Sequence, residues 1–264
     1  MNETEIEKAA SFLSQSRLGG PRTSLLPEEL VPQTETEGYA IQAALHEILA
    51  LAGYGNLVGH KIGCTTEVMQ KFLNIDHPCA GEIFRSMVFL GEANIQLSRF
   101  HRIGVECEIA ARLGQDMLGE KGPYTRESAA AAVGSLMGAI ELVDDRYENY
   151  ALLNAPTLIA DDFFNAGVVL GAEEINWQEL NLGAIDGVLY INNCEHSRGV
   201  GSDILGHPLE ALAWLANHRA GLGRPLRAGT FVMLGSVVET VFFDSPAEVS
   251  VLLEGVGEAR VKFV

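Results

Sequence analysis

The stretch Val105-Glu-Cys-Glu-Ile-Ala-Ala111, with Leu136-Met-Gly-Ala-Ile-Glu-Leu-Val143 further along the chain, is the most informative part of this sequence. Both segments are predicted to be strands, in which successive side chains alternate between the two faces. Glu106 and Glu108 therefore share one face, and Glu141 interrupts an apolar run. Buried carboxylates are costly unless a cation compensates them. The three glutamates are thus expected to have a function within a β-rich core.

Two interpretations of the three carboxylates are open on spacing alone. Three oxygen donors without clustered His or Cys suit a hard divalent cation, Mg²⁺ or Mn²⁺, better than zinc. Alternatively, Glu106 and Glu108 form a solvated strand face, and Glu141 pairs with Arg146 or Lys61.

Composition excludes several classes of partner. The 264 residues include 35 acidic and 18 basic ones, a formal charge of -17, which argues against nucleic acid or an anionic membrane surface. An anionic substrate would need a local cationic site. The amino terminus lacks a signal peptide's apolar region, and no apolar run is long enough to span a membrane. We expect a cytoplasmic protein whose cysteines are free thiols: Cys64, Cys79, Cys107 and Cys194.

The order of elements predicts one α+β domain over 1–264, with a helical amino-terminal layer at about 1–75 and a β-rich core at about 76–264. Thr34 and Glu37 form a capping box that opens a helix ended by Gly53 and Gly55. Hydrophobic periodicity predicts the remaining elements. Helices are expected over 3–15, 67–73, 126–133 and 208–219, and strands over 56–62, 104–113, 136–143, 166–171, 187–191, 230–235, 239–243, 248–254 and 258–264.

Several polar residues outside the two strands are candidates for a site. Lys61 ends a strand, where a lysine is usually solvated. Asp76 precedes a turn that contains proline, where an aspartate commonly serves the turn itself. Asp162 precedes a predicted strand, and Gly235-Ser236 lies between two strands, where backbone N–H groups can meet a carboxylate.

Six short motifs occur in one order along the chain. They are Gly59-His-Lys-Ile-Gly-Cys-Thr65, Val105-Glu-Cys-Glu-Ile-Ala110, Ile140-Glu-Leu-Val-Asp-Asp-Arg146, Ala160-Asp-Asp-Phe-Phe-Asn-Ala-Gly167, Leu205-Gly-His-Pro-Leu-Glu-Ala-Leu-Ala-Trp-Leu-Ala-Asn217 and Leu226-Arg-Ala-Gly229. Together they resemble the 2-keto-4-pentenoate hydratase and 4-oxalocrotonate decarboxylase branch of the fumarylacetoacetate hydrolase superfamily. The resemblance covers essentially the whole chain and implies a fumarylacetoacetase C-terminal-like mixed β-roll core.

The resemblance also implies roles for particular residues. It makes Lys61 an active-site residue, and Asp76 and Asp162 secondary candidates for proton transfer or water positioning. Candidates for substrate binding are Lys61, Arg146, Gly235 and Ser236. The ligands of Mg²⁺ or Mn²⁺ would be Glu106, Glu108 and Glu141.

Three positions depart from the family pattern. Asp162 stands where these enzymes usually carry Asn, and Cys79 stands where an acidic residue is common. Leu234 replaces a threonine before Gly235, and loss of that hydroxyl is expected to alter contacts with the substrate carboxylate. These changes suggest an unusual substrate or an altered activity.

The resemblance implies a metal-dependent hydratase that adds water to a 2-hydroxy-2,4-dienoate in the catabolism of aromatic compounds. Such a substrate offers a carboxylate oxygen and an adjacent enolate oxygen that together chelate one cation. The segments 207–217 and 165–171 look hydratase-like. A decarboxylase of a 2-keto-3-enedioate is the alternative, because 143–149 and 255–264 look decarboxylase-like.

Two further alternatives stay open. A carbon–carbon hydrolase is less favoured, because no His-Glu pair that could activate water is evident in the helical amino-terminal segment. A non-catalytic partner subunit of the same fold would tolerate the changes at Asp162 and Leu234.

Assembly is also predicted. Related enzymes are homo-oligomers, and hydratases and decarboxylases of this branch associate with each other. Strands such as Phe231-Val-Met-Leu234 are apolar on both faces, so part of that surface is expected to be buried between subunits.

Overall fold

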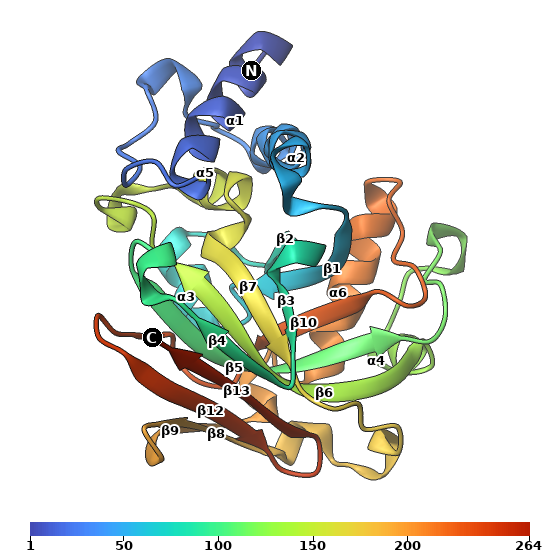
Figure 1. The fold of residues 1–264 in the computed structure, drawn as a ribbon. Helices are drawn as coiled ribbons and strands as arrows, with labels where there is room; N and C mark the ends of the chain where they lie inside the picture. The colour runs from blue at the N-terminus through green and yellow to red at the C-terminus, as the bar shows by residue number, and fades with distance from the viewer.

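Two β-sheets lie one above the other in the structure, a computed structural model that describes residues 1–264 (Figure 1). The larger sheet has eight strands in the order β2-β1-β10-β5-β6-β7-β3, with β11 paired to β5. Its strands are β1 Leu57–Gly63, β2 Cys79–Phe84, β3 Val88–Leu90, β5 Ile103–Leu113, β6 Val133–Asp144, β7 Asn165–Leu170, β10 Phe231–Ser236 and β11 Val241–Phe242.

The smaller sheet has five strands in the order β4-β13-β12-β8-β9 and lies at the bottom of the view. Its strands are β4 Glu92–Ile95, β8 Asp186–Ile191, β9 Cys194–Val200, β12 Ala247–Leu253 and β13 Gly257–Phe263. The larger sheet is mixed, because β1 runs parallel to β10 while β5 is antiparallel to β10 and to β6.

Six α-helices surround the sheets. They are α1 Glu3–Arg17, α2 Glu35–Leu49, α3 Glu67–Leu73, α4 Arg126–Ala130, α5 Ala155–Ala160 and α6 Pro208–Gly221. The capping box of Thr34 and Glu37 opens α2 as the sequence predicts. The helix ends before Gly53, where the chain forms a wider turn with Gly53 at φ 97°. No helix is long and apolar enough to cross a membrane.

The larger sheet separates two hydrophobic cores. Helices α1 and α2 pack on one face, where they meet Phe231 and Met233 of β10. Helix α6 and the smaller sheet pack on the other face, where they meet Val232 and Leu234. Side-chain alternation along β10 therefore supplies both cores. Because all four residues are buried within one chain, their two apolar faces do not require a second subunit, contrary to the expectation from the sequence.

The predicted α+β class and the predicted core strands are confirmed. The sequence analysis did not identify β2, β3, β4, β9 or α5, because these elements are short or lack apolar alternation. Strand β1 lies inside the larger sheet between β2 and β10, so the amino-terminal segment contributes a sheet strand as well as helices.

Candidate metal and substrate site

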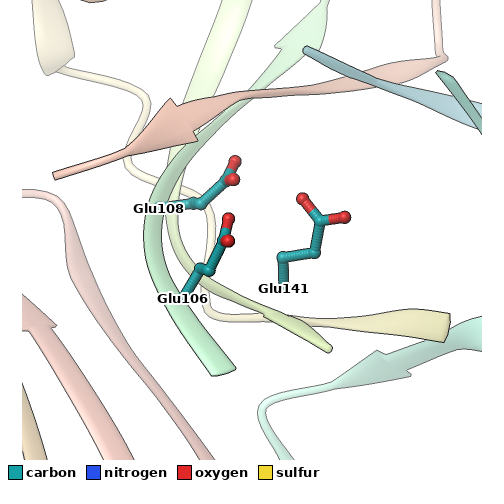
Figure 2. A group of neighbouring side chains, drawn as sticks. All are labelled: Glu106, Glu108 and Glu141. Atoms are coloured by element: carbon teal, nitrogen blue, oxygen red, sulfur yellow. The ribbon is translucent and has the colours of Figure 1, made fainter. Parts of the chain in front are cut away.

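Three carboxylates meet on the face of the larger sheet against which α1 and α2 pack. Glu106 on β5 is directly opposite Glu141 on the antiparallel β6, and Glu108 lies two residues further along β5. One carboxylate oxygen from each residue lies within 4.8 Å of those of the other two (Figure 2). Strand alternation and pairing register thus place the three side chains together, as the sequence predicts.

The cluster is mostly shielded from water. Glu141 is 0% exposed and Glu108 is 1% exposed, so the expectation of a solvated strand face is wrong for Glu108. Burial raises the pKa of Glu108 well above its ordinary value, and the neighbouring Glu141 and Glu106 raise it further. Burial likewise raises the pKa of Glu141, against the opposing influence of Lys61. Each carboxylate therefore makes the charged form of its neighbours less favourable, and a bound cation would relieve this repulsion.

One uncharged hydrogen-bond donor orients each carboxylate. The Thr240 hydroxyl donates to Glu106. The Gly235 N–H donates to Glu108 Oε2 at 3.1 Å, and Asn165 Nδ2 donates to Glu141 Oε1 at 2.9 Å. Glu141 Oε2 is buried with no hydrogen-bond partner. An all-oxygen donor set with a buried unpartnered carboxylate oxygen fits a hard divalent cation.

Lys61 is part of this cluster. Its Nζ lies 3.3 Å from Glu141 Oε1 and donates to the Phe163 carbonyl at 3.4 Å. The residue is 4% exposed, so a solvated lysine is wrong, whereas the pairing of Glu141 with Lys61 is present. Burial acts to lower the pKa of Lys61, but Glu141 and the other two glutamates together raise it above its ordinary value. The ammonium therefore stays charged beside the carboxylates.

Gly235 and Ser236 fix the end of β10 beside the cluster. The Gly235 N–H donates to Glu108, and the Ser236 hydroxyl, 2.7 Å from the Val238 carbonyl and 3.2 Å from the Cys107 carbonyl, donates its one hydrogen to these acceptors. In this structure both residues position the end of β10 against Glu108. Their predicted contact with substrate stays a prediction.

Gly235→Ala is expected to disturb the cluster at this point. Gly235 has φ 128°, and a Cβ there would lie 2.6 Å from Thr65 Oγ1. Relief of the clash moves the N–H away from Glu108, and strained backbone costs about 1–3 kcal/mol. The free energy of unfolding should fall by more than that amount in urea denaturation, because the clash adds to the strain. Gly229 also has a left-handed φ, 84°, but no neighbour within 4 Å, so Gly229→Ala carries strain without a clash. Equal losses in both variants would contradict the role of Gly235.

Asp162 lies beside Lys61. Its carboxylate bonds His46 Nε2 at 2.7 Å and accepts from the Glu82 N–H at 3.0 Å. A Cβ on Gly81 would touch both the Lys61 stem, at 2.9 Å, and Asp162 Oδ1, at 3.3 Å. Gly81 thus allows the Asp162 carboxylate to approach the stem of Lys61.

Two other predicted residues are not brought to the cluster. Arg146 Nη2 donates to Asp161 Oδ2 at 2.9 Å, and the residue is 3% exposed. It therefore belongs to a buried ion pair and does not pair with Glu141. The Asp76 side chain is 99% exposed and lies 4.0 Å from His77. Its sequence context is that of a turn, which is where the structure places it.

The departures at Cys79 and Leu234 are also located. Leu234 packs into the core on the opposite face from the glutamates, so the missing hydroxyl at this position does not alter the cluster. Cys79 is fully buried in a small cluster with Cys64 and Phe163.

The structure adds polar residues that the sequence analysis missed. His46 and Gln42 lie on the buried face of α2, and a polar side chain in that apolar stripe is the signal that could have identified them. Asn165 lies in one of the six motifs, but the resemblance implied no role for it. Thr240 and Arg17 had no local signal, because their partners are distant in sequence.

Comparison with known proteins agrees with this arrangement. The family model described as fumarylacetoacetate (FAA) hydrolase C-terminal matches residues 66–264. A 2-keto-4-pentenoate hydratase from Paraburkholderia phymatum is 32% identical over 262 residues, which cover 99% of this chain and 98% of that protein. A 2-hydroxyhexa-2,4-dienoate hydratase from Comamonas testosteroni is 29% identical, with 99% and 97% covered.

Solved structures show the same fold. The 4-oxalocrotonate decarboxylase from Pseudomonas putida G7, complexed with magnesium and adipate, has a TM-score of 0.92 at 21% identity, with 100% of this chain and 99% of that chain covered. Fumarylpyruvate hydrolase from Pseudomonas aeruginosa, in complex with Mn2+ and pyruvate, has a TM-score of 0.59 at 13% identity, with 78% and 89% covered.

The chain belongs to the fumarylacetoacetate hydrolase family. Within that family its relatives are those of the 2-keto-4-pentenoate hydratase and 4-oxalocrotonate decarboxylase branch, as the six motifs predict.

Proposed function

We propose that this protein is a divalent-metal-dependent hydratase that adds water to a 2-hydroxy-2,4-dienoate. The main support is the cluster of Glu106, Glu108 and Glu141 beside the buried Lys61, in a chain similar over its full length to proteins named as such hydratases. The buried carboxylates and the buried lysine place opposite charges side by side. Such a site can hold a cation and an anionic substrate together.

Glu106, Glu108 and Glu141 would hold the cation, which we propose to be Mg²⁺ or Mn²⁺. Their oxygen-only donor set matches these ions, and related folds are described with magnesium or with Mn2+ and pyruvate. When bound, the metal would supply Lewis-acid stabilisation of the negative charge that develops on the 2-oxygen of the substrate.

Lys61 would hold the substrate carboxylate or transfer a proton. Hydration of the dienol removes the enol proton, adds a proton at the far end of the diene, and then adds the oxygen of water at C4 and a proton at C3. The product is a 4-hydroxy-2-keto acid. The Lys61 ammonium supplies positive charge beside Glu141, and the Asp162 carboxylate lies near the aliphatic part of the Lys61 side chain. Asp162 is thus our candidate for orienting water.

A spectrophotometric assay tests this function. The purified protein with Mg²⁺ or Mn²⁺ should consume the ultraviolet absorbance of short and long 2-hydroxy-2,4-dienoates and form 4-hydroxy-2-keto acids. Metal-bound protein that leaves every dienol unchanged would overturn the hydratase proposal.

Decarboxylation of a 2-keto-3-enedioate is the second candidate. The observation that favours it is the decarboxylase-like sequence at 143–149 and 255–264. The same cluster would stabilise the enolate left when CO₂ departs. Release of CO₂ from a keto-enedioate, without hydration of dienols, would reverse the order of the two candidates.

We also propose a homo-oligomer in the cytoplasm, although β10 no longer supports assembly. Exposed apolar side chains on the surface are more suitable contacts, among them Val68, Phe72, Leu90 and Leu152. Light scattering at micromolar concentration should give a mass above 28.5 kDa, the mass of one chain. A single monomeric species would contradict the assembly.

A further inference from the structure

The segment from Asp161 to Asn165 contacts the cluster through the Phe163 carbonyl and the Asn165 side chain. The Phe163 carbonyl accepts from Lys61 Nζ at 3.4 Å, and Asn165 Nδ2 donates to Glu141 Oε1 at 2.9 Å. The segment therefore touches both charged partners of the Lys61–Glu141 pair. Its position affects where the Lys61 ammonium lies.

This segment has an unusual backbone. Asp162, Phe163 and Phe164 are consecutive non-glycine residues with φ values of 49°, 45° and 66°. The left-handed conformation is unfavourable for L-residues other than glycine. Such a conformation persists only where surrounding contacts determine it. Those contacts are therefore part of what positions the Phe163 carbonyl.

Arg17, the last residue of α1, holds the segment at both ends. Its Nε donates to Asp161 Oδ1 at 2.5 Å, and its Nη2 donates to the Asp161 carbonyl at 2.6 Å. Its Nη1 donates to the Asn165 carbonyl at 3.2 Å. The side chain is 4% exposed. A planar guanidinium can span these three acceptors in a way that a single ammonium cannot.

His46 of α2 holds the middle of the segment. Its Nε2 lies 2.7 Å from Asp162 Oδ2, and Asp162 Oδ1 accepts from the Glu82 N–H at 3.0 Å. The Asp162 carboxylate is thus fixed at both oxygens.

We propose that Arg17 and His46 are positioning residues for Lys61. They hold the left-handed segment 161–165 from the side of the helical layer, and that segment presents the Phe163 carbonyl to the Lys61 ammonium. The two amino-terminal helices thereby form part of the catalytic machinery, although neither residue touches the cluster. This inference rests on the proposed function only where turnover is measured.

Lysine labelling tests the position of Lys61 without turnover. Lys61 is the one buried lysine, and the four exposed ones serve as internal standards: Lys8, Lys71, Lys121 and Lys262. Reductive methylation of the Mg²⁺-loaded protein, followed by peptide mass spectrometry, should leave Lys61 protected. In Arg17→Met and His46→Ala its labelling rate should rise at least tenfold relative to the standards.

Conservative variants separate positioning from charge. Arg17→Lys keeps the charge but cannot make the three contacts. The labelling rate of Lys61 should therefore be as high in this variant as in Arg17→Met. His46→Gln keeps a donor for Asp162 and should restore part of the protection. Arg22→Met is the matched control, because Arg22 pairs with Asp145 at the surface and does not contact the segment. In this control the labelling rate of Lys61 should equal that of the wild type.

The outcomes distinguish this inference from the proposed function. Wild-type protection of Lys61 in Arg17→Lys, or in both Arg17→Met and His46→Ala, would overturn the positioning role. If Arg17→Met does not fold, Arg17→Lys decides. Where the wild type hydrates dienols, kcat should fall about tenfold in the variants with labelled Lys61. Absence of hydration in the wild type would refute the function and leave the labelling test valid.

The pH dependence of stability gives a second readout. Burial acts to lower the pKa of His46, but Asp162 and Glu82 raise it above its ordinary value, and Arg17 opposes them. A raised folded-state pKa gives stability that is complete below the ordinary value of about 6.5 and is lost as pH rises through the folded-state value. His46→Gln should lack this loss in urea denaturation above about pH 6.5. An identical pH profile for wild type and His46→Gln would contradict a charged His46–Asp162 pair.

Discussion

Lys61→Ala should lower the turnover of a 2-hydroxy-2,4-dienoate by roughly 10²–10⁴-fold at saturating Mg²⁺, the usual span for a positioned acid or base. The reason is the position of its ammonium, 3.3 Å from Glu141 Oε1 and almost completely buried. No other lysine can replace it there. Metal affinity should stay constant or rise, because removal of a nearby cation relieves repulsion with the metal. Calorimetric titration and initial rates measure the two effects separately.

Lys71→Ala is the matched control for this change. Lys71 pairs with Glu67 at the surface of α3, and its side chain is 77% exposed. Both turnover and metal affinity should match the wild type. Normal turnover in Lys61→Ala would disprove the role of Lys61, and a large loss of metal affinity would make Lys61 a support of the metal site instead.

Removal of the metal should lower the melting temperature of the wild type by roughly 5–10 °C. Metal at about 100 times its Kd adds about 2.7 kcal/mol to the folded state, and each kcal/mol corresponds to about 2–4 °C in a chain of this size. Glu108→Gln should abolish most of this response. Its amide oxygen still accepts from the Gly235 N–H, but one of the three like charges is gone. The metal-free variant should therefore be at least as stable as the metal-free wild type.

Differential scanning fluorimetry with chelator and with added Mg²⁺ measures these shifts. Glu254→Gln is the control, because Glu254 is exposed on the smaller sheet side and should leave the response unchanged. A wild-type melting temperature that ignores both chelator and Mg²⁺ would contradict the metal site. It would then favour the alternative of a non-catalytic partner subunit, in which Lys61 neutralises the glutamates internally.

The sequence predicted the site best where its geometry is local. A period of two along β5 places Glu106 and Glu108 on one face, and this is a property of any strand. The family resemblance grouped Glu141 with the other two glutamates, whereas its place opposite Glu106 depends on the register of β5 with β6, which only the structure gives. The prediction of fold class also succeeded from local patterns, because long apolar segments dominate the larger sheet.

The rest depended on contacts between residues distant in sequence. Lys61 and Asp76 are both polar residues near the ends of predicted elements, yet one is buried and the other is fully exposed. Only the pairing of β1 with β2 and β10 decides between them. The family resemblance implied a substrate-binding role for Arg146. In the structure Arg146 pairs with Asp161, which adjoins a segment whose left-handed backbone no propensity predicts.

The pairing of β5 with β6 has a consequence for the order of folding. Glu106, Glu108 and Glu141 come from two strands that are consecutive in the larger sheet and joined by a single connection, 114–132. Lys61, Arg17 and Gly235 must arrive from segments much further away along the chain, and closure of such long loops is slow. During refolding, metal binding should therefore reappear before the lysine is buried. The chain would then pass through a state in which the three glutamates can bind a divalent cation while Lys61 is still exposed to solvent.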